Sequence, residues 1–168
     1  MATHVLLIGG RSGSGKTQAA SELHALLARE DVRHAVIEGD YLDLAHPTPW
    51  EHHLAERNLA AVWANYRELG YERLIYSNTI APLQAAELAA AMGDDPVVTA
   101  VVLSASNDTV YARLAGRESG AELLEHLRRS EAAAARLDEE CTPEVIRIDT
   151  NGRTSAEVGE RIRSLLPW

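Results

Sequence analysis

The chain has 168 residues, of which 46% are apolar and 24% charged, and its 25 acidic and 16 basic side chains give a formal net charge of −9. This length fits one domain with a sizeable core, and this composition excludes a disordered, collagen-like or disulfide-rich chain. No apolar run reaches the roughly 20 residues of a membrane-spanning helix, and an acidic chain is poorly suited to a nucleic-acid backbone. We therefore expect a single domain over residues 1–168 that binds neither membranes nor nucleic acid.

The N-terminal residues, the single cysteine and the single lysine are each informative. The N-terminal residues lead into an apolar stretch without a basic region, so the sequence indicates no signal peptide. Cys141 is the only cysteine, which excludes an internal disulfide and indicates a reducing, cytoplasmic setting. Of the 16 basic residues, all are arginine except Lys16, so this one lysine calls for a chemical explanation.

Strands and helices alternate along the first half of the chain. The short apolar run at residues 5–8 ends in two glycines and predicts a buried strand, and apolar residues at helical spacing predict a helix over 16–30. The patterns that follow predict a strand at 33–38, a proline-containing loop at 41–49, a helix at 50–69 and a strand at 74–76.

The second half continues the alternation. Its patterns predict a helix at 82–92, a strand at 97–103, helices at 107–115 and 117–137, a strand at 145–148 and a helix at 154–166. The run from Glu131 to Glu140 is rich in alanine and charge, which is typical of a solvated helix face. Five strands that alternate with helices predict an α/β fold with a parallel sheet covered on both faces.

One segment carries a specific chemical signal. Residues 10–17 match the phosphate-binding pattern G-x-x-x-x-G-K-[ST], between a predicted strand and a predicted helix. Glycines let backbone N–H groups turn toward a phosphate chain, and the positive end of the next helix faces the same anion. Lys16 is expected to reach the β- and γ-phosphates, and the Thr17 hydroxyl to hold Mg²⁺. We expect nucleotide contacts from Gly10, Arg11, Ser12, Gly13, Ser14, Gly15, Lys16 and Thr17.

Two rival nucleotide motifs are not met. A dinucleotide fingerprint G-x-G-x-x-G fails because Gln18 stands where glycine or alanine belongs. A guanine-binding Asn/Thr-Lys-x-Asp motif is excluded because the one lysine already lies in the phosphate loop. A regulatory GTPase is therefore not expected.

The phosphate loop resembles that of the small P-loop kinases, such as shikimate, gluconate, adenylyl-sulfate and chloramphenicol kinases. A further likeness, to the tunicamycin-resistance ATP-binding proteins, is carried by residues 14–18, 22–24, 78–80, 106–109 and 113–114. The resemblance implies a three-layer α/β/α P-loop fold with five parallel strands in the order 2-3-1-4-5. It also implies the use of ATP and Mg²⁺, and a helical lid at about residues 116–130 that closes over the phosphates.

Asp40 is the expected catalytic carboxylate. It follows the second predicted strand, at the edge of the sheet where open α/β sheets bind ligands. The resemblance implies that Asp40 orients or deprotonates a hydroxyl of the acceptor. Asp43 and Glu38 are alternatives for this role, and a purely structural role in the loop stays open for Asp40.

Arginines are expected to balance the charge of the transferring phosphoryl group. The resemblance places them on the lid, where Arg113 is a candidate phosphate clamp and Arg117 a catalytic one. Arg128 and Arg129 lie in the same region, and ion pairs with neighbouring glutamates are the structural alternative.

The acceptor pocket is expected to use Tyr41 and Trp50 as flat apolar surfaces, with Asn78 and Thr79 as hydrogen-bonding groups. The resemblance places Asn151 beside the adenine, with a simple turn as the alternative. His46, His52 and His53 lack the spacing of a metal site and fit the pocket lining or a helix face.

The resemblance fails in one respect. The third and fourth strands end in Ser77 and Ser104, so neither offers a Walker-B-type acid for Mg²⁺, and Asp40 or water would have to replace it. We predict an ATP- and Mg²⁺-dependent kinase acting on a hydroxyl of a metabolite or antibiotic, as a monomer or homodimer. The alternative is a nucleotide-dependent binding or resistance protein that sequesters a ligand with little turnover.

Overall fold

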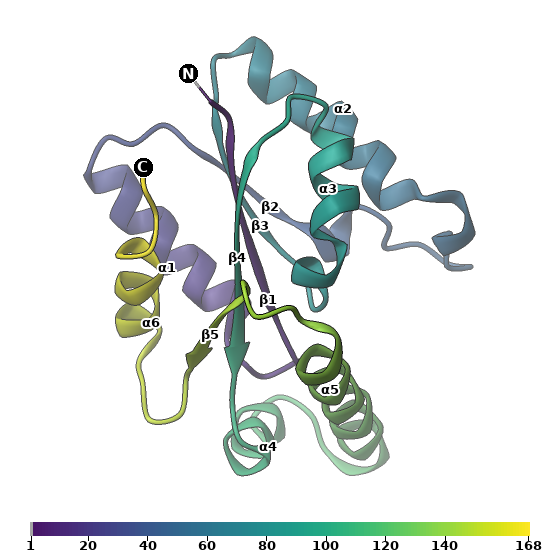
Figure 1. Cartoon of the computed structure of the whole chain (residues 1–168). Helices are drawn as coiled ribbons and strands as arrows, with labels where there is room; N and C mark the ends of the chain where they lie inside the picture. Colours follow the sequence, from purple (N-terminus) through teal and green to yellow (C-terminus); the bar gives the residue numbers. More distant parts are fainter. Residues whose placement is uncertain (1) are drawn as a thin grey trace.

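The computed structural model of the chain describes residues 2–168 as a parallel sheet with helices on both faces (Figure 1). The five strands lie in the order β2-β3-β1-β4-β5, which confirms the predicted fold class and strand order. They are β1 (His4–Gly10), β2 (Ala35–Glu38), β3 (Arg73–Ser77), β4 (Val97–Ser104) and β5 (Ile146–Asp149).

Six α-helices surround the sheet in the described part of the chain. On one face α1 packs against α6, on the other α2 packs against α3, and α4 and α5 lie together beyond the carboxyl ends of the strands (Figure 1). Across residues 2–168, each helix is too short or too polar to cross a membrane. The helices are α1 (Lys16–Arg29), α2 (Leu54–Glu68), α3 (Ala85–Met92), α4 (Asn107–Ala115), α5 (Gly120–Glu140) and α6 (Ser155–Arg163).

The central strand β1 is buried on both faces, as its continuous apolar run predicts. Val5 and Leu7 join the core under α2 and α3, whereas Leu6 and Ile8 join the core under α1 and α6. All four side chains are at most 1% exposed. The loop that follows β1 therefore starts from a rigid position.

Two predicted helices begin later than expected. The predicted helix 50–69 is divided into a 3-10 helix at Trp50–His52 and α2 from Leu54, because His53 between them has a left-handed backbone (φ 48°). The predicted helix 82–92 likewise opens with a 3-10 turn over Ala81–Gln84, and its α-helical part starts at Ala85. Trp50 thus lies on a connecting segment rather than on α2.

The helix predicted at 117–137 is α5, which begins at Gly120 and ends at Glu140. Its first residue has a left-handed backbone (φ 63°), and the preceding helix α4 ends at Ala115. Residues 116–119 therefore connect two helices, and the expected lid comprises this connection and the first half of α5. Most of the charged run from Glu131 to Glu140 is exposed, as predicted, whereas Leu137 within it is buried.

Candidate active site

Polar residues after three neighbouring strands meet at the carboxyl edge of the sheet. Because β1, β2 and β3 run parallel, the segments that follow them lie at the same edge. The Gly10 N–H donates to the Thr79 carbonyl at 3.0 Å, so the phosphate loop after β1 is fastened to the segment after β3. The site is thereby built on rigid strand ends.

The phosphate loop has the curled backbone that its sequence predicts. Gly15, at the start of α1, has a φ of 95°, and Gly10 has a φ of 144°. A Cβ at Gly10 would lie 2.5 Å from the Leu103 carbonyl oxygen, so only glycine fits there. Glycine at the start of α1 has no side chain with which to cap the first N–H groups, and these groups stay available to an anion.

Lys16 lies folded over this loop and is 9% exposed. Its ammonium donates to the Gly10 carbonyl at 2.7 Å and to the Arg11 carbonyl at 3.3 Å. Burial lowers the pKa of Lys16, and the carboxylates of Asp40 and Glu38 oppose this shift by stabilising the ammonium. The one lysine of the chain is therefore a positive charge held between the phosphate loop and two acids.

An acid next to Thr17 comes from β2, and it is Glu38 rather than Asp40, the residue expected to replace a Walker-B-type acid. The Thr17 hydroxyl donates to Glu38 Oε2 at 3.2 Å, and Glu38 lies beside Ser77 in the register of β2 with β3. The Ser77 hydroxyl is buried without a hydrogen-bond partner, which fits a place where a hydrated ion belongs. Hydroxyl and carboxylate oxygens are ligands that Mg²⁺ prefers, so these residues suit a Mg²⁺ ion.

Two cavities adjoin at this edge. The loop cavity, of about 360 Å³, is lined by phosphate-loop residues together with Glu38, Thr79, Arg113 and Arg117. The large cavity has a volume of about 910 Å³. It is enclosed by α3, by α5 and by the segment that leads into α2. Its lining is Asp40, Asp43, Leu44, Ala45, Thr48, Trp50, His53, Leu54, Ala55, Glu56, Tyr76, Asn78, Ile80, Gln84, Leu88, His126, Arg129 and Arg136.

Asp40 belongs to the lining of both cavities. Its carboxyl group is exposed to the solvent of these cavities. Partial burial nevertheless raises the pKa of Asp40, the charge of Lys16 lowers it, and the nearby Asp43 raises it. Asp40 is therefore a carboxylate with increased basicity at the boundary between a phosphate-binding loop and a second cavity.

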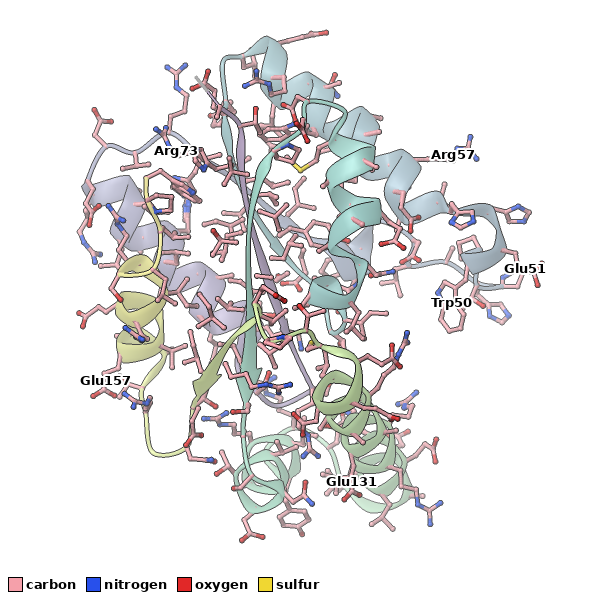
Figure 2. The ribbon with its side chains drawn as sticks, viewed as in Figure 1. Trp50, Glu51, Arg57, Arg73, Glu131 and Glu157 are labelled. Carbon is pink, nitrogen blue, oxygen red and sulfur yellow. The ribbon has the colours of Figure 1, made fainter. Side chains whose placement is uncertain are left out.

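Three of the four residues expected to bind the acceptor line one of the two cavities. Trp50 and Asn78 line the large cavity, and Thr79 lines the loop cavity. Figure 2 shows Trp50 and Glu51 on the segment that leads into α2. Tyr41 is 75% exposed and lines neither cavity, so this structure does not bring it into the pocket. The aromatic ring that lines the large cavity from the sheet is Tyr76 instead.

The expected arginines also differ in what they face. Arg117 is exposed on the α4–α5 connection and lines the loop cavity, free to meet a phosphate. Arg113 lines the same cavity, but it donates to the Gly13 carbonyl at 2.9 Å and to Thr150 at 3.2 Å, and so supports the loop. Arg11 is buried with its Nε donating to Ser130 at 2.8 Å, which leaves only its backbone for a nucleotide.

The Asn151 side chain is held by hydrogen bonds within the protein. Its side-chain oxygen accepts from the Ser106 N–H at 3.0 Å, and its amide donates to Asp149 at 2.7 Å. It thus fastens the connection after β4 to the one after β5. A small cavity of about 160 Å³ on this side of the loop is lined by other residues, which include Arg113, Thr150 and Arg153.

A second residue shared by the two cavities is His126 of α5, which the sequence analysis did not single out. Its ring contacts Ser12 of the phosphate loop and Glu118 of the α4–α5 connection. Ser12 and His126 are 114 positions apart, so no local pattern could have paired them.

A parallel sheet in this order, with a glycine-rich loop between β1 and α1, defines a P-loop fold. No family model matches the sequence, and none of the curated proteins matches it. Solved structures do match, among them the tunicamycin resistance protein of Deinococcus radiodurans. It is 23% identical, with a TM-score of 0.65 over 98% of this chain and 96% of that one.

Two kinases give similar agreement. A sugar kinase from Janibacter is 20% identical, with a TM-score of 0.62 over 98% of this chain and 94% of that one. The shikimate kinase of Acinetobacter baumannii, in complex with shikimate, is 16% identical, with a TM-score of 0.60 over 98% of this chain and 93% of that one. These likenesses confirm that the chain has the P-loop fold of small kinases, as the resemblance implied.

Proposed function

We propose that this protein is an ATP- and Mg²⁺-dependent phosphotransferase that phosphorylates a hydroxyl group of a small molecule. The position of Asp40 carries this proposal, because its carboxylate borders both the loop cavity, beside Lys16, and the large cavity. An acceptor in the large cavity would thus present its hydroxyl to a base and to a phosphate at once. The folds of a sugar kinase and a shikimate kinase are consistent with this assignment.

The residues at the boundary of the two cavities would share the steps of the transfer. The acceptor oxygen forms a bond to the γ-phosphorus, the bond from that phosphorus to the bridging oxygen breaks, and ADP leaves. Asp40 takes the hydroxyl proton, and its raised pKa brings its basicity closer to that needed at neutral pH. Lys16 and the backbone N–H groups of the loop balance the phosphate charge, and Arg117 adds a further positive charge from the α4–α5 connection.

Thr17 and Glu38 would hold the Mg²⁺ ion. When bound, this ion neutralises charge on the β- and γ-phosphates. The nucleotide base would lie toward the small cavity, where the guanidinium groups of Arg113 and Arg153 offer flat surfaces for stacking.

The large cavity indicates the kind of acceptor. Its volume of about 910 Å³ lies near the upper end of the range for sites that bind drug-sized ligands. Its lining combines an apolar part, from Leu44, Leu54, Ile80 and the ring of Trp50, with acids and arginines. We expect an acceptor larger than a simple sugar, with apolar surface as well as hydroxyl groups.

Replacing Glu38 tests the Mg²⁺ assignment. Glu38→Gln keeps the size of the side chain but removes its charge, so the Mg²⁺ concentration needed for half-maximal stabilisation by ATP should rise roughly 10- to 100-fold. This Mg²⁺ concentration is measured from melting temperatures recorded at a fixed ATP concentration and increasing Mg²⁺. Glu51→Gln is the matched control, because Glu51 is exposed near α2 and lines neither cavity. An unchanged Mg²⁺ requirement in Glu38→Gln would remove this acid from the metal site.

One observation favours a second candidate function, a nucleotide-dependent binding protein. The ends of β3 and β4 carry Ser77 and Ser104 where a Walker-B-type acid could stand, which favours a protein that binds ATP with little turnover. Such a protein would sequester a ligand in a nucleotide-dependent way.

The two functions separate in one assay. ATP consumption is measured with Mg²⁺, alone and with pools of hydroxylated metabolites and antibiotics, with Lys16→Ala as the blank. Consumption that rises with one pool supports the kinase and begins to identify the acceptor. Flat consumption with every pool, together with clear thermal stabilisation by ATP, would refute the kinase and support the binding protein.

A further inference from the structure

His126 lies at the boundary between the loop cavity and the large cavity, and it is held there by hydrogen bonds on both ring nitrogens. Its Nδ1 is 2.9 Å from both carboxylate oxygens of Glu118, and its Nε2 is 2.7 Å from the Ser12 hydroxyl of the phosphate loop. Together with Asp40, it is one of the two residues of the described chain that line both the loop cavity and the large cavity. Its ring therefore borders both the phosphate loop and the space expected for an acceptor.

The partners of the ring define its protonation pattern. A carboxylate can only accept hydrogen bonds, so Nδ1 carries a proton that it donates to Glu118. In the neutral ring Nε2 then has a lone pair and accepts a hydrogen bond from the Ser12 hydroxyl. In the imidazolium form Nε2 becomes a donor, and Glu118 balances the positive charge. The ring can thus turn from a partner of Ser12 into a donor to an anion without moving far.

Other charged groups share this boundary. Glu118 contacts the ring directly. Arg129 lies one turn after His126 on α5. Arg136, also on α5, lines the large cavity. The remaining charged groups that line the two cavities come from other elements, and they are Lys16, Glu38, Asp40, Asp43, Glu56, Arg113 and Arg117. Three basic and three acidic residues line the loop cavity, whereas two basic and three acidic residues line the large cavity. An imidazolium at this boundary therefore adds a positive charge beside the loop, where a phosphate chain would bind.

A purely structural role does not account for His126, because another residue already fastens α5 to the phosphate loop. Ser130, one turn along α5, is 2% exposed, accepts from Arg11 Nε and donates to the Ser12 carbonyl, each at 2.8 Å. Ser130 lines neither of the two cavities. The two contacts to the loop therefore differ: one is buried behind the loop, and the other faces the ligand space.

We propose that His126 is a catalytic residue of the phosphoryl transfer, and that its imidazolium, oriented by Glu118, donates from Nε2 to the γ-phosphoryl group. This inference rests on the proposed function and adds a residue to it. During the transfer the acceptor proton goes to Asp40, and His126 keeps both of its protons, so that it stabilises charge rather than exchanging protons. Glu118 is the positioning residue for the ring.

Nucleotide affinities test this proposal without knowledge of the acceptor. The affinities for Mg·ADP and for Mg·AMPPNP, which has a γ-group, are measured by calorimetry for the wild type and for His126→Phe, which keeps a ring but loses both N–H donors. A lost charge-assisted hydrogen bond should weaken Mg·AMPPNP binding about tenfold or more and leave Mg·ADP binding nearly unchanged. His126→Arg should restore much of the lost affinity for Mg·AMPPNP. The affinity of Glu118→Gln for Mg·AMPPNP should lie between those of the wild type and His126→Phe.

Ser130→Ala is the matched control, because it removes the other hydrogen bond between α5 and the loop. It should lower the melting temperature and leave the ratio of the two affinities as in the wild type. The same ratio in His126→Phe as in the wild type would overturn the proposal.

Spectroscopy of the wild type covers the case in which His126→Phe does not fold. In ¹⁵N-histidine spectra, the Nε2 resonance of His126 should shift on addition of Mg·AMPPNP and not of Mg·ADP, and equal shifts with both would refute the contact. Failure of the proposed function looks different: the wild type would then consume no ATP with any acceptor, whatever the affinity ratio.

Discussion

Lys16→Ala is expected to reduce ATP turnover to the level of a reaction without enzyme, a loss of at least about 10²–10³-fold. The ammonium of Lys16 is the buried cation of the phosphate loop, and the structure holds it between the loop carbonyls and the carboxylates of Asp40 and Glu38. No other lysine exists in the chain that could take its place. ADP release measured with Mg²⁺ and a responsive acceptor pool gives the comparison.

The fold should survive this change. Burial destabilises the charged form of Lys16, so removing the ammonium relieves a desolvation cost while it deletes two hydrogen bonds to loop carbonyls. Thermal melting should therefore stay close to that of the wild type. Lys16→Arg is an informative companion, because a planar guanidinium keeps the charge but does not match the compact ammonium. Full turnover in Lys16→Ala, with the melting curve unchanged, would overturn the phosphate-loop assignment.

The phosphate loop and the sheet could be predicted because their signals are local. A G-x-x-x-x-G-K-T run between a buried strand and a helix specifies its own backbone, and the alternation of strands and helices indicates a parallel sheet. The strand order came from the resemblance, since alternation alone does not order strands. The start of α2 was misplaced because the left-handed backbone at His53 leaves no mark in the apolar pattern.

The contacts that complete the site are long-range, and the sequence does not show them. Glu38 reaches Thr17 only because β2 ends at the same sheet edge as the phosphate loop, whereas a Walker-B-type acid is expected at the end of the third or fourth strand. Asn151 was placed by its position after β5, but its side chain bonds to Ser106 and Asp149 instead. Tyr41 follows Asp40 directly, yet the turn after β2 directs it to solvent.

Asp40→Asn is expected to lower turnover roughly 10²–10⁴-fold, the usual contribution of a positioned base. The amide fills the same space but cannot take the proton of the acceptor hydroxyl. Affinity for Mg·ATP should be kept or slightly increased, because a negative charge beside the phosphate cavity is removed. Steady-state kinetics with varied ATP separates kcat from KM. If turnover survives in Asp40→Asn and is lost in Asp43→Asn, the base is Asp43.

The pH dependence of turnover gives an independent test of the same carboxylate. Asp40 must be ionised to accept a proton, so activity falls as the pH drops through its pKa. Burial raises the pKa of Asp40, so this loss should occur at a higher pH than for an ordinary aspartate. Asp43 adds to this rise, and Asp43→Asn should therefore shift the acid limb of the kcat/KM profile to lower pH while turnover at neutral pH is retained. An acid limb that stays in place in Asp43→Asn would assign the limb to another group, because the charge of Asp43 raises the pKa of Asp40.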